Sequence, residues 1–248
     1  MAVHGNKLAV CGYNFSTHTS FIDLFTLTDP DSSSPLMTQL YTKLFDHPRW
    51  QHRYVSILDD SHIVYVYVDI VQVYHIEADD SEPSHTVNLL HNRSAQGVTV
   101  REGEIFIGLS SDEVIVFDFS LNEIKTITLK GLKRHPFSVH LDITVYGDNL
   151  FIYYERRAIR YNMEGKIVHE YKAPGYSHAL SITVSGLVYI LWNHRHVVVY
   201  SLSDSQQLMS FDVDESDRIR IVDVNRLLTV RDYTGEVREY SMVSTAGL

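Results

Sequence analysis

The residues whose spacing in this sequence could suggest a metal site are histidines in short polar segments. The chain has 14 histidines. His194 and His196 alternate and would share one face if they lay on a strand, while His47 and His52 could approach each other within a loop. Two imidazoles are weak evidence for a metal site without a third ligand. We therefore expect hydrogen-bonded or solvated histidines, with no bound metal and no other cofactor.

The sequence lacks the motifs of the common catalytic sites. It contains no Gly-Xaa-Ser-Xaa-Gly elbow, no glycine loop that would cradle phosphates and no Cys-Xaa-Xaa-Cys pair. Its single cysteine, Cys11, lies in an apolar segment and is expected to be a buried, inert thiol. One cysteine permits no internal disulfide, which favours a reducing compartment, so we expect the protein in the cytoplasm. We expect it not to be an enzyme.

Composition and charge restrict the class of protein further. The 248 residues are 44% hydrophobic, with 16 Tyr and 10 Phe, which suits one large all-β domain or two smaller ones. No run of about 18 apolar residues is present, so we expect no contact with a membrane. The formal net charge of −10 argues against indiscriminate binding of nucleic acids.

The elements that must position any site are short strands that repeat along the chain. Residues 96–129 read as four strands, GVTV, EIFIGL, EVIVFDF and EIKTITL, joined by short connections that contain Ser, Asp, Asn or Gly. Such connections predict an antiparallel meander. Because one sheet of this kind cannot bury both of its faces, copies of it must stack.

Six copies of this unit can be aligned, and from the third copy onward the period is about 39 to 44 residues, the range of a four-stranded propeller blade. A pair of β-sandwiches would not repeat at a fixed period. The sequence therefore predicts an all-β fold, a six-bladed β-propeller of four-stranded antiparallel blades in a single domain. The approximate blades are residues 1–46, 47–90, 91–130, 131–173, 174–213 and 214–248.

The first and last copies are expected to be incomplete. The first copy begins partway through its inner strand, and the sixth ends near Met242, where an outer strand should follow. Because an open ring leaves two sheet edges unpaired, we expect either a domain excised from a longer chain or an incomplete last blade. Closure by packing alone is the alternative.

The loops predicted at one face of the propeller are rich in Arg, Lys and His, and those at the other face are mainly acidic. The basic face also offers Trp50, Tyr54, Tyr176 and Trp192 as candidate stacking groups. A surface of arginines and aromatic rings suits the recognition of phosphate or carboxylate groups. The predicted partner-binding residues on this face are Arg49, Trp50, His52, Arg53, Arg93, Lys133, Arg134, His135, Arg156, Arg157, Tyr176, His178, His194, Arg195, His196 and Arg218.

The segment GVTVREGEIFIGLSSDEVIVFD (Gly97 to Asp118) resembles an NHL-type blade of the WD40-like propellers. No Trp-Asp dipeptide ends any third strand, so WD40 blades proper fit less well. The aspartate that usually closes the first strand of this blade is present as Asp59 but is replaced by Arg101 and Tyr146 in other copies. The resemblance implies a domain that reads substrates at the C-terminal end of a larger ubiquitin-ligase or signalling protein.

Three functions follow as hypotheses. The first is a non-catalytic recognition or scaffold module that binds an acidic or phosphorylated segment of a partner protein through the basic face. The second is binding of single-stranded RNA on the same face, by stacking of bases on aromatic rings beside arginines. The third and least favoured is a calcium-dependent propeller hydrolase. The predicted mouths of the inner strands carry Arg53, Gln96, His140, His178 and Arg218, a cationic set that would repel calcium. No small-molecule substrate is evident.

Overall fold

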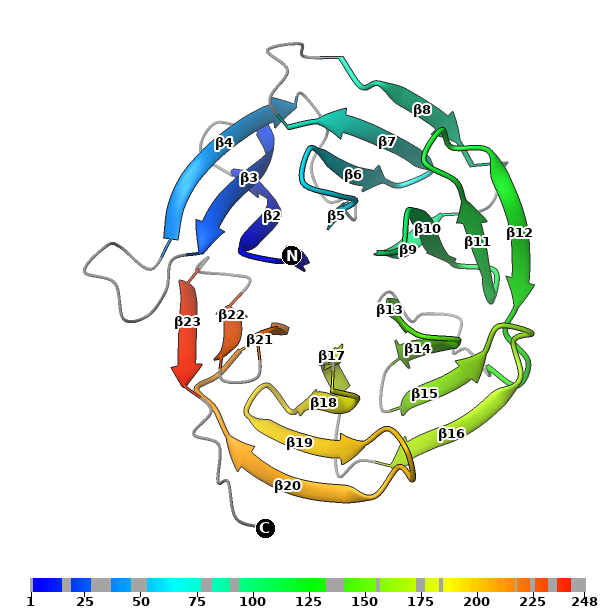
Figure 1. The fold of residues 1–248 in the computed structure, drawn as a ribbon, viewed down its shortest axis with the longest axis vertical. Coiled ribbons are helices and arrows are strands. Elements are labelled where there is room, and N and C mark those ends of the chain that lie inside the picture. Colours follow the sequence, from blue (N-terminus) through cyan, green and yellow to red (C-terminus); the bar gives the residue numbers. More distant parts are fainter. Residues whose placement is uncertain are drawn as a thin grey trace. The chain divides into compact units, whose positions relative to one another are not determined.

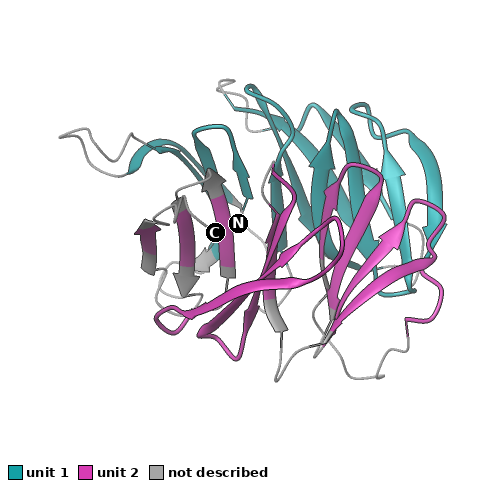
Figure 2. Cartoon of the chain, turned by 60° about the horizontal axis from the view of Figure 1, so that its bottom comes forward, with its two compact units in different colours: residues 1–128 teal, residues 129–248 magenta. Residues whose placement is uncertain are grey.

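The computed structural model of this chain contains strands, turns and loops, with no helix in the residues that it describes. The described residues are 2–14, 19–27, 37–45, 53–76, 82–89, 94–132, 141–154, 157–172, 177–182, 185–216, 218–223, 226–231 and 236–241. The chain forms two compact units, residues 1–128 and residues 129–248 (Figure 2).

In its described residues, the first unit contains three antiparallel sheets of four strands each. Their strands are β1 (Ala2–His4), β2 (Lys7–Asn14), β3 (Thr19–Leu27) and β4 (Met37–Phe45); β5 (Arg53–Ile57), β6 (His62–Tyr67), β7 (Ile70–His75) and β8 (His85–Asn88); and β9 (Ala95–Arg101), β10 (Glu104–Leu109), β11 (Glu113–Phe117) and β12 (Glu123–Thr128).

The second unit contains two four-stranded sheets and one sheet with three strands among the described residues. Their strands are β13 (Leu141–Tyr146), β14 (Asn149–Tyr154), β15 (Arg157–Asn162) and β16 (Ile167–Lys172); β17 (Ser177–Ile182), β18 (Leu187–Trp192), β19 (His196–Ser201) and β20 (Gln207–Asp212); and β21 (Arg218–Asp223), β22 (Arg226–Arg231) and β23 (Glu236–Ser241).

Every sheet is a meander of consecutive strands (Figure 1). The chain is therefore an all-β, six-bladed β-propeller of antiparallel sheets, which confirms the predicted fold class. The first sheet has all four strands, although β1 has only three residues. In the sixth sheet the described residues supply no fourth strand beside β23.

Burial follows the position of a strand within its sheet. In the third sheet the side chains of β10 and β11 are almost all buried, whereas five of the six side chains of β12 are exposed. In this sheet the second and third strands are covered on both faces and read as nearly continuous apolar runs, while the outer strand accepts polar side chains.

Each third strand carries an aromatic residue at the same place in the repeat. These residues are Phe25, Tyr74, Phe117, Tyr161, Tyr200 and Tyr240. In four of the sheets the pairing with the fourth strand shifts by one residue at this aromatic position. Such bulges increase the local twist, so the aromatic repeat and the bulge belong to the scaffold rather than to a binding motif.

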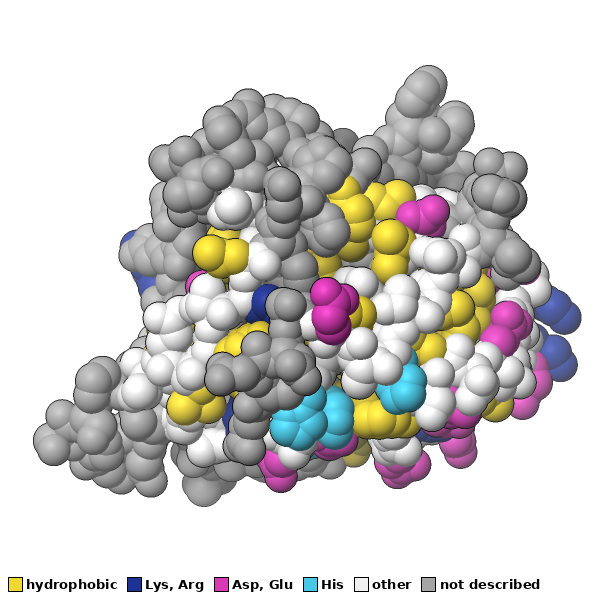
Figure 3. All heavy atoms as spheres, turned by 90° about the horizontal axis from the view of Figure 1, so that it is seen from above, with side chains coloured by type: hydrophobic (Ala, Val, Ile, Leu, Met, Phe, Trp, Pro, Cys, Tyr) yellow, Lys and Arg dark blue, Asp and Glu magenta, His cyan; other side chains and the backbone are white. Residues whose placement is uncertain are grey.

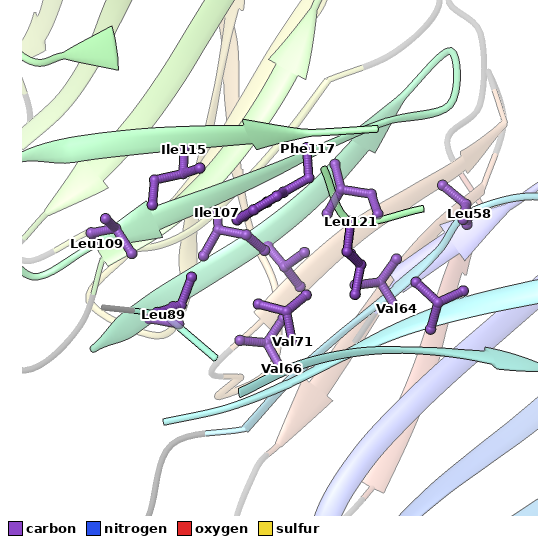
Figure 4. Close-up of a cluster of buried hydrophobic side chains, with 14 residues drawn as sticks. Leu58, Val64, Val66, Val71, Leu89, Ile107, Leu109, Ile115, Phe117 and Leu121 are labelled. Carbon is purple, nitrogen blue, oxygen red and sulfur yellow. The ribbon is translucent and has the colours of Figure 1, made fainter. Parts of the chain in front are cut away.

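Stacked sheets within each unit share hydrophobic cores. Ile107 and Phe117 of the third sheet pack with Val64 and Val71 of the second (Figure 4). In the second unit, Leu191 and Val197 of the fifth sheet pack with Leu227 of the sixth. These cores hold the sheet ends, where the candidate site lies, in fixed positions relative to their neighbours in the same unit.

Among the residues with described side chains, the exposed large hydrophobic ones belong to fourth strands. They are Leu40, Leu44, Ile124, Ile167, Val168, Leu208 and Met209. Figure 3 shows one face of the molecule, on which hydrophobic side chains lie among polar, acidic and histidine side chains. Across the described residues, no helix has the length and apolar character needed to cross a membrane.

Candidate functional site

Five of the predicted partner-binding residues have described side chains, namely Arg53, Arg157, His194, Arg195 and His196. Only the backbone is described for His178, at the second residue of β17, and for Arg218, at the first residue of β21. The remaining predictions lie outside the described residues: Arg49, Trp50, His52, Arg93, Lys133, Arg134, His135, Arg156 and Tyr176.

Two of these five predicted residues, both arginines, interact through their guanidinium groups with residues of their own sheets. The guanidinium of Arg157 donates two hydrogen bonds to Glu170, from Nε to Oε1 at 2.7 Å and from Nη2 to Oε2 at 2.8 Å. The guanidinium carbon of Arg53 lies 5.6 Å from the ring centroid of Tyr67, a cation–π distance. Neither arrangement leaves the planar fork of the arginine fully open to a ligand.

The other three residues lie in or beside the tight turn between β18 and β19. Asn193 and His194 have φ values of 48° and 63°, and the N–H of Arg195 donates to the carbonyl of Trp192 at 3.1 Å. Two consecutive positive φ values are the mark of a type I′ hairpin turn. His194 therefore lies in the turn and not on a strand, so it does not share a strand face with His196.

The connection from β20 to β21 packs against this turn. The N–H of Val213 donates to the carbonyl of Arg195, and the N–H of Ser216 donates to the carbonyl of His194, both at 2.7 Å. Val213 and Ser216 are buried, and the Ser216 hydroxyl donates to the carbonyl of Asp214 at 2.8 Å. The backbone of this link is thus fixed to the turn, and its acidic side chains project from a rigid base.

Acidic side chains of the link and of the last residue of β20 lie next to the basic side chains of the turn. His196 Nδ1 is 2.7 Å from Asp212 Oδ1, and Arg195 Nη2 is 3.8 Å from Glu215 Oε2. The Arg195 side chain is nevertheless 68% exposed. Because 3.8 Å is beyond hydrogen-bond distance and exposed pairs contribute little, Glu215 holds Arg195 only weakly.

Two residues of the sixth sheet complete the site. Arg238 of β23 contacts Asp214 Oδ2 through Nη1, and the Tyr240 hydroxyl donates to the same oxygen at 3.0 Å. The N–H of Asp214 in turn donates to the Tyr240 hydroxyl at 2.9 Å. In Figure 1 the chain leaves β20 beside β23. We call residues 193–196, 212–216, 238 and 240 the turn–link cluster.

The electrostatics of the cluster centre on the Asp214 carboxylate. Hydrogen bonds from Tyr240 and from Arg238 lower the pKa of Asp214, and the charges of Arg238 and Arg195 lower it further. One guanidinium and one hydroxyl of the sixth sheet thus contact the same carboxylate oxygen, and the charge of Arg195 acts on it from the turn of the fifth sheet. Such a set of donors can bind a carboxylate or a phosphate.

Arg238, Tyr240 and Asp214 were not among the residues predicted from the sequence. A signal was available, because the third strand of the sixth repeat reads VREYS where that of the fifth reads VVVYS. Charged residues in place of valines on a third strand indicate a strand that faces something other than an apolar neighbour. Their pairing with Asp214 depends on how the link runs and could not be read from the repeat.

The structure also removes one residue from the predicted stacking groups. Trp192 is fully buried, with 0% exposure, within the core between the fourth and fifth sheets. The prediction that it offers a stacking surface is wrong. Tyr54 is partly buried and packs against the core between the second and third sheets, while Trp50 and Tyr176 lie outside the described residues.

Comparison with known proteins identifies the fold and no family. No family model matches the chain, and no curated protein matches it. Among solved structures it is similar to a protein of unknown function from Bacteroides caccae, with 10% identity and a TM-score of 0.67 over 96% of this chain and 91% of that chain. In all, 1213 chains of solved structures match, and a fold used so widely does not narrow the function.

Within the described residues, no group of three His, Cys, Asp or Glu side chains could hold a metal ion. One group of neighbouring histidine rings lies in the first unit, where the ring of His62 lies 4.9 Å from that of His75 and 4.7 Å from that of Phe119. His62 Nδ1 is also 3.0 Å from Asp59 Oδ1. These rings pack edge to face on one another, as in an aromatic cluster.

Proposed function

We propose that this protein is a non-catalytic recognition module that binds an acidic or phosphorylated segment of a partner protein, and that the turn–link cluster forms part of the binding surface. The resemblance to NHL-type blades supports a role as the substrate-reading part of a larger ubiquitin-ligase or signalling protein in the cytoplasm.

One observation carries this proposal: Arg238 and the Tyr240 hydroxyl both contact Asp214 Oδ2, and Arg195, whose charge also acts on Asp214, lies beside Glu215 of the same link. Arg195 extends from a turn whose backbone is fixed by the link, and Arg238 from a strand of the neighbouring sheet. The backbone that carries both arginines therefore needs no ordering on binding, and only their side chains lose conformational entropy.

The acidic side chains of the cluster restrict the kinds of ligand that it can bind. Arg195, His196 and Arg238 each lie beside a carboxylate, from Glu215, Asp212 and Asp214 respectively. The cluster is therefore not a simple basic patch that would attract any polyanion. It suits a ligand whose anionic groups reach the arginines better than the link's own carboxylates do.

The test is binding to an array of peptides that includes acidic, phosphorylated, neutral and basic sequences. We expect the protein to prefer acidic or phosphorylated peptides and the variant Arg195→Glu/Arg238→Glu to lose that preference. The matched control is Lys130→Glu/Lys166→Glu, which makes the same change of charge at two exposed positions of the same unit. The absence of any preference, or an equal loss in both variants, would overturn the proposal.

Binding of single-stranded RNA is the competing outcome. A filter-binding titration with random RNA at low salt measures it directly, and affinity that falls steeply with added salt would indicate phosphate-backbone contacts. If RNA binds tightly, this binding is lost in Arg195→Glu/Arg238→Glu and no peptide is preferred, then the ligand of the cluster is RNA and not a protein segment.

A further inference from the structure

Asp214 is an anion that the protein supplies to its own site. Its carboxylate accepts a hydrogen bond from the Tyr240 hydroxyl at 3.0 Å, contacts Arg238 and lies within the field of Arg195. In the proposed function these same groups bind the ligand. Any ligand must therefore take the position of a carboxylate that is already there.

The competitor is tethered, which makes it hard for a similar group to displace. The backbone of the link is fixed through Val213 and Ser216, so the Asp214 carboxylate remains next to its donors. A tethered group acts at a high effective concentration relative to the same group on a free molecule. A carboxylate from a partner offers the same charge and the same two oxygens, so it gains nothing over Asp214.

A phosphate group differs in the two properties that matter. A phosphomonoester carries a charge of about −1.5 to −2 at neutral pH and has three acceptor oxygens. It could therefore accept hydrogen bonds from the Arg238 fork and the Tyr240 hydroxyl and still present an oxygen to Arg195, whose exposed side chain lies 3.8 Å from Glu215 of the same link. The Asp214 carboxylate has one oxygen fewer.

Displacement of Asp214 requires no change in the backbone. Its side chain is 62% exposed, and the backbone hydrogen bonds of the link involve Val213 and Ser216 rather than the Asp214 carboxylate. The side chain can rotate into water while the link stays in place. Because exposed ion pairs contribute little to folding stability, this rotation leaves the fold intact, while the tethered carboxylate still competes with a ligand at a high effective concentration.

We infer that the turn–link cluster takes a phosphomonoester, as in a phosphorylated partner segment, and that Asp214 acts as an internal competitor that excludes segments that are merely acidic. The inference rests on the proposed function, which leaves acidic and phosphorylated ligands open. It assigns Arg195, Arg238 and Tyr240 as ligand-binding residues and Asp214 as the residue that sets selectivity.

The experiment compares two synthetic probes, an acetylated and amidated Gly-Gly-phosphoserine-Gly-Gly peptide and the same peptide with Glu in place of phosphoserine. Both are titrated by NMR into the full chain. We expect the phosphopeptide to bind at least about tenfold more tightly than the Glu peptide, since charge-assisted hydrogen bonds are the stronger kind. Tyr240→Phe, which keeps the ring and removes the hydroxyl donor, should weaken the binding of the phosphopeptide and leave that of the Glu peptide unchanged.

The decisive variant is Asp214→Asn, which should bind the Glu peptide at least about fivefold more tightly than the unaltered chain does and so narrow the selectivity. Asp204→Asn is the matched control, because Asp204 is an exposed aspartate of another turn in the same unit. Thermal unfolding of each variant verifies that it is folded.

The outcomes separate the inference from the proposed function. If both peptides bind equally and Asp214→Asn changes neither, the recognition function stands and the inference is overturned. If neither peptide binds and the peptide array also shows no preference, the proposed function itself fails. If Asp214→Asn weakens both probes, Asp214 positions Arg238 rather than competing with the ligand, and the inference is again overturned.

Discussion

The guanidinium of Arg157 and the carboxylate of Glu170 form a two-bond fork across strands β15 and β16, at 2.7 Å and 2.8 Å. The hydrogen bonds to Glu170 raise the pKa of Arg157, so its charge is fixed at all ordinary pH values. Arg157, which was predicted to bind a partner, therefore joins two neighbouring strands of one sheet.

We therefore expect Arg157→Gln to affect stability and not recognition. The free energy of unfolding should fall by roughly 0.5–1 kcal/mol, near the upper end for a partly exposed pair because the geometry is bidentate. Urea denaturation gives this value, and titration with the phosphoserine peptide should give an unchanged affinity. An affinity loss as large as that of Arg195→Gln would place Arg157 in the binding surface as originally predicted.

The second prediction concerns Lys43, which is 7% exposed although it lies on an outer strand. Its Nζ lies 3.9 Å from the ring centroid of Tyr74 in the neighbouring sheet, so a cation–π contact joins two sheets of the first unit. We expect a double-mutant cycle of Lys43→Met with Tyr74→Leu to give a coupling of about 0.5–2 kcal/mol. The control cycle uses Tyr74→Phe, which keeps the ring, and its coupling should be much smaller.

How far the sequence determines these features depends on the periodicity of each strand. Alternation and turn residues predicted the third sheet almost residue by residue, since β10 is the predicted EIFIGL. The second strand of the fifth sheet, LVYILW, is a continuous apolar run and carries no signal of which side chains face outward. That is why Trp192 was predicted as exposed and proves to be buried.

The candidate site shows the same limit in another form. Arg195 was predicted because its loop is basic, and this required only the order of the strands. The contact between Tyr240 and Asp214 joins residues 26 apart in the chain, and it depends on the path of a link that the repeat does not specify. The positive φ of His194 was also hidden, since a histidine does not mark such a turn as glycine would.

A third prediction tests the burial of Trp192 by fluorescence. The chain has two tryptophans, so Trp50→Phe leaves Trp192 as the only indole. We expect its emission to shift to the red on unfolding, and iodide to quench it far less in the folded than in the urea-unfolded protein, because a fully buried ring excludes an ionic quencher. Equal quenching in the two states would show that the ring reaches the surface.

A fourth prediction concerns acid stability through Asp59. The N–H of Ser61 donates to Asp59 Oδ1 at 2.7 Å, and His62 Nδ1 lies 3.0 Å from the same oxygen. Partial burial raises the pKa of Asp59, but these hydrogen bonds together outweigh it and the net pKa is lowered. A carboxyl group of this kind stabilises the fold above its unfolded pKa of about 3.9, and the contribution is lost as pH falls through the folded value.

Unfolding in urea at a series of pH values from about 6 to about 3 tests this sign. The unaltered chain should lose more stability toward the acid end than Asp59→Asn does, because the amide has no proton to gain. If the two proteins lose stability in parallel over this range, the contact with Ser61 and His62 does not contribute through ionisation of Asp59.

The last prediction concerns the turn that carries Arg195. His194 has a φ of 63°. This conformation is unfavourable for any residue with a Cβ atom, but not for glycine. His194→Gly creates the Asn-Gly pair preferred in type I′ turns and should raise the free energy of unfolding by up to about 1 kcal/mol. His194→Val should lower it by about 1–2 kcal/mol, because a β-branched residue tolerates this region poorly. The control is His169→Gly in β16, where glycine within a strand should be destabilising.

If His194→Gly also leaves the affinity for the phosphoserine peptide unchanged, the imidazole of His194 is not part of the binding surface, and the turn serves to hold Arg195 in place.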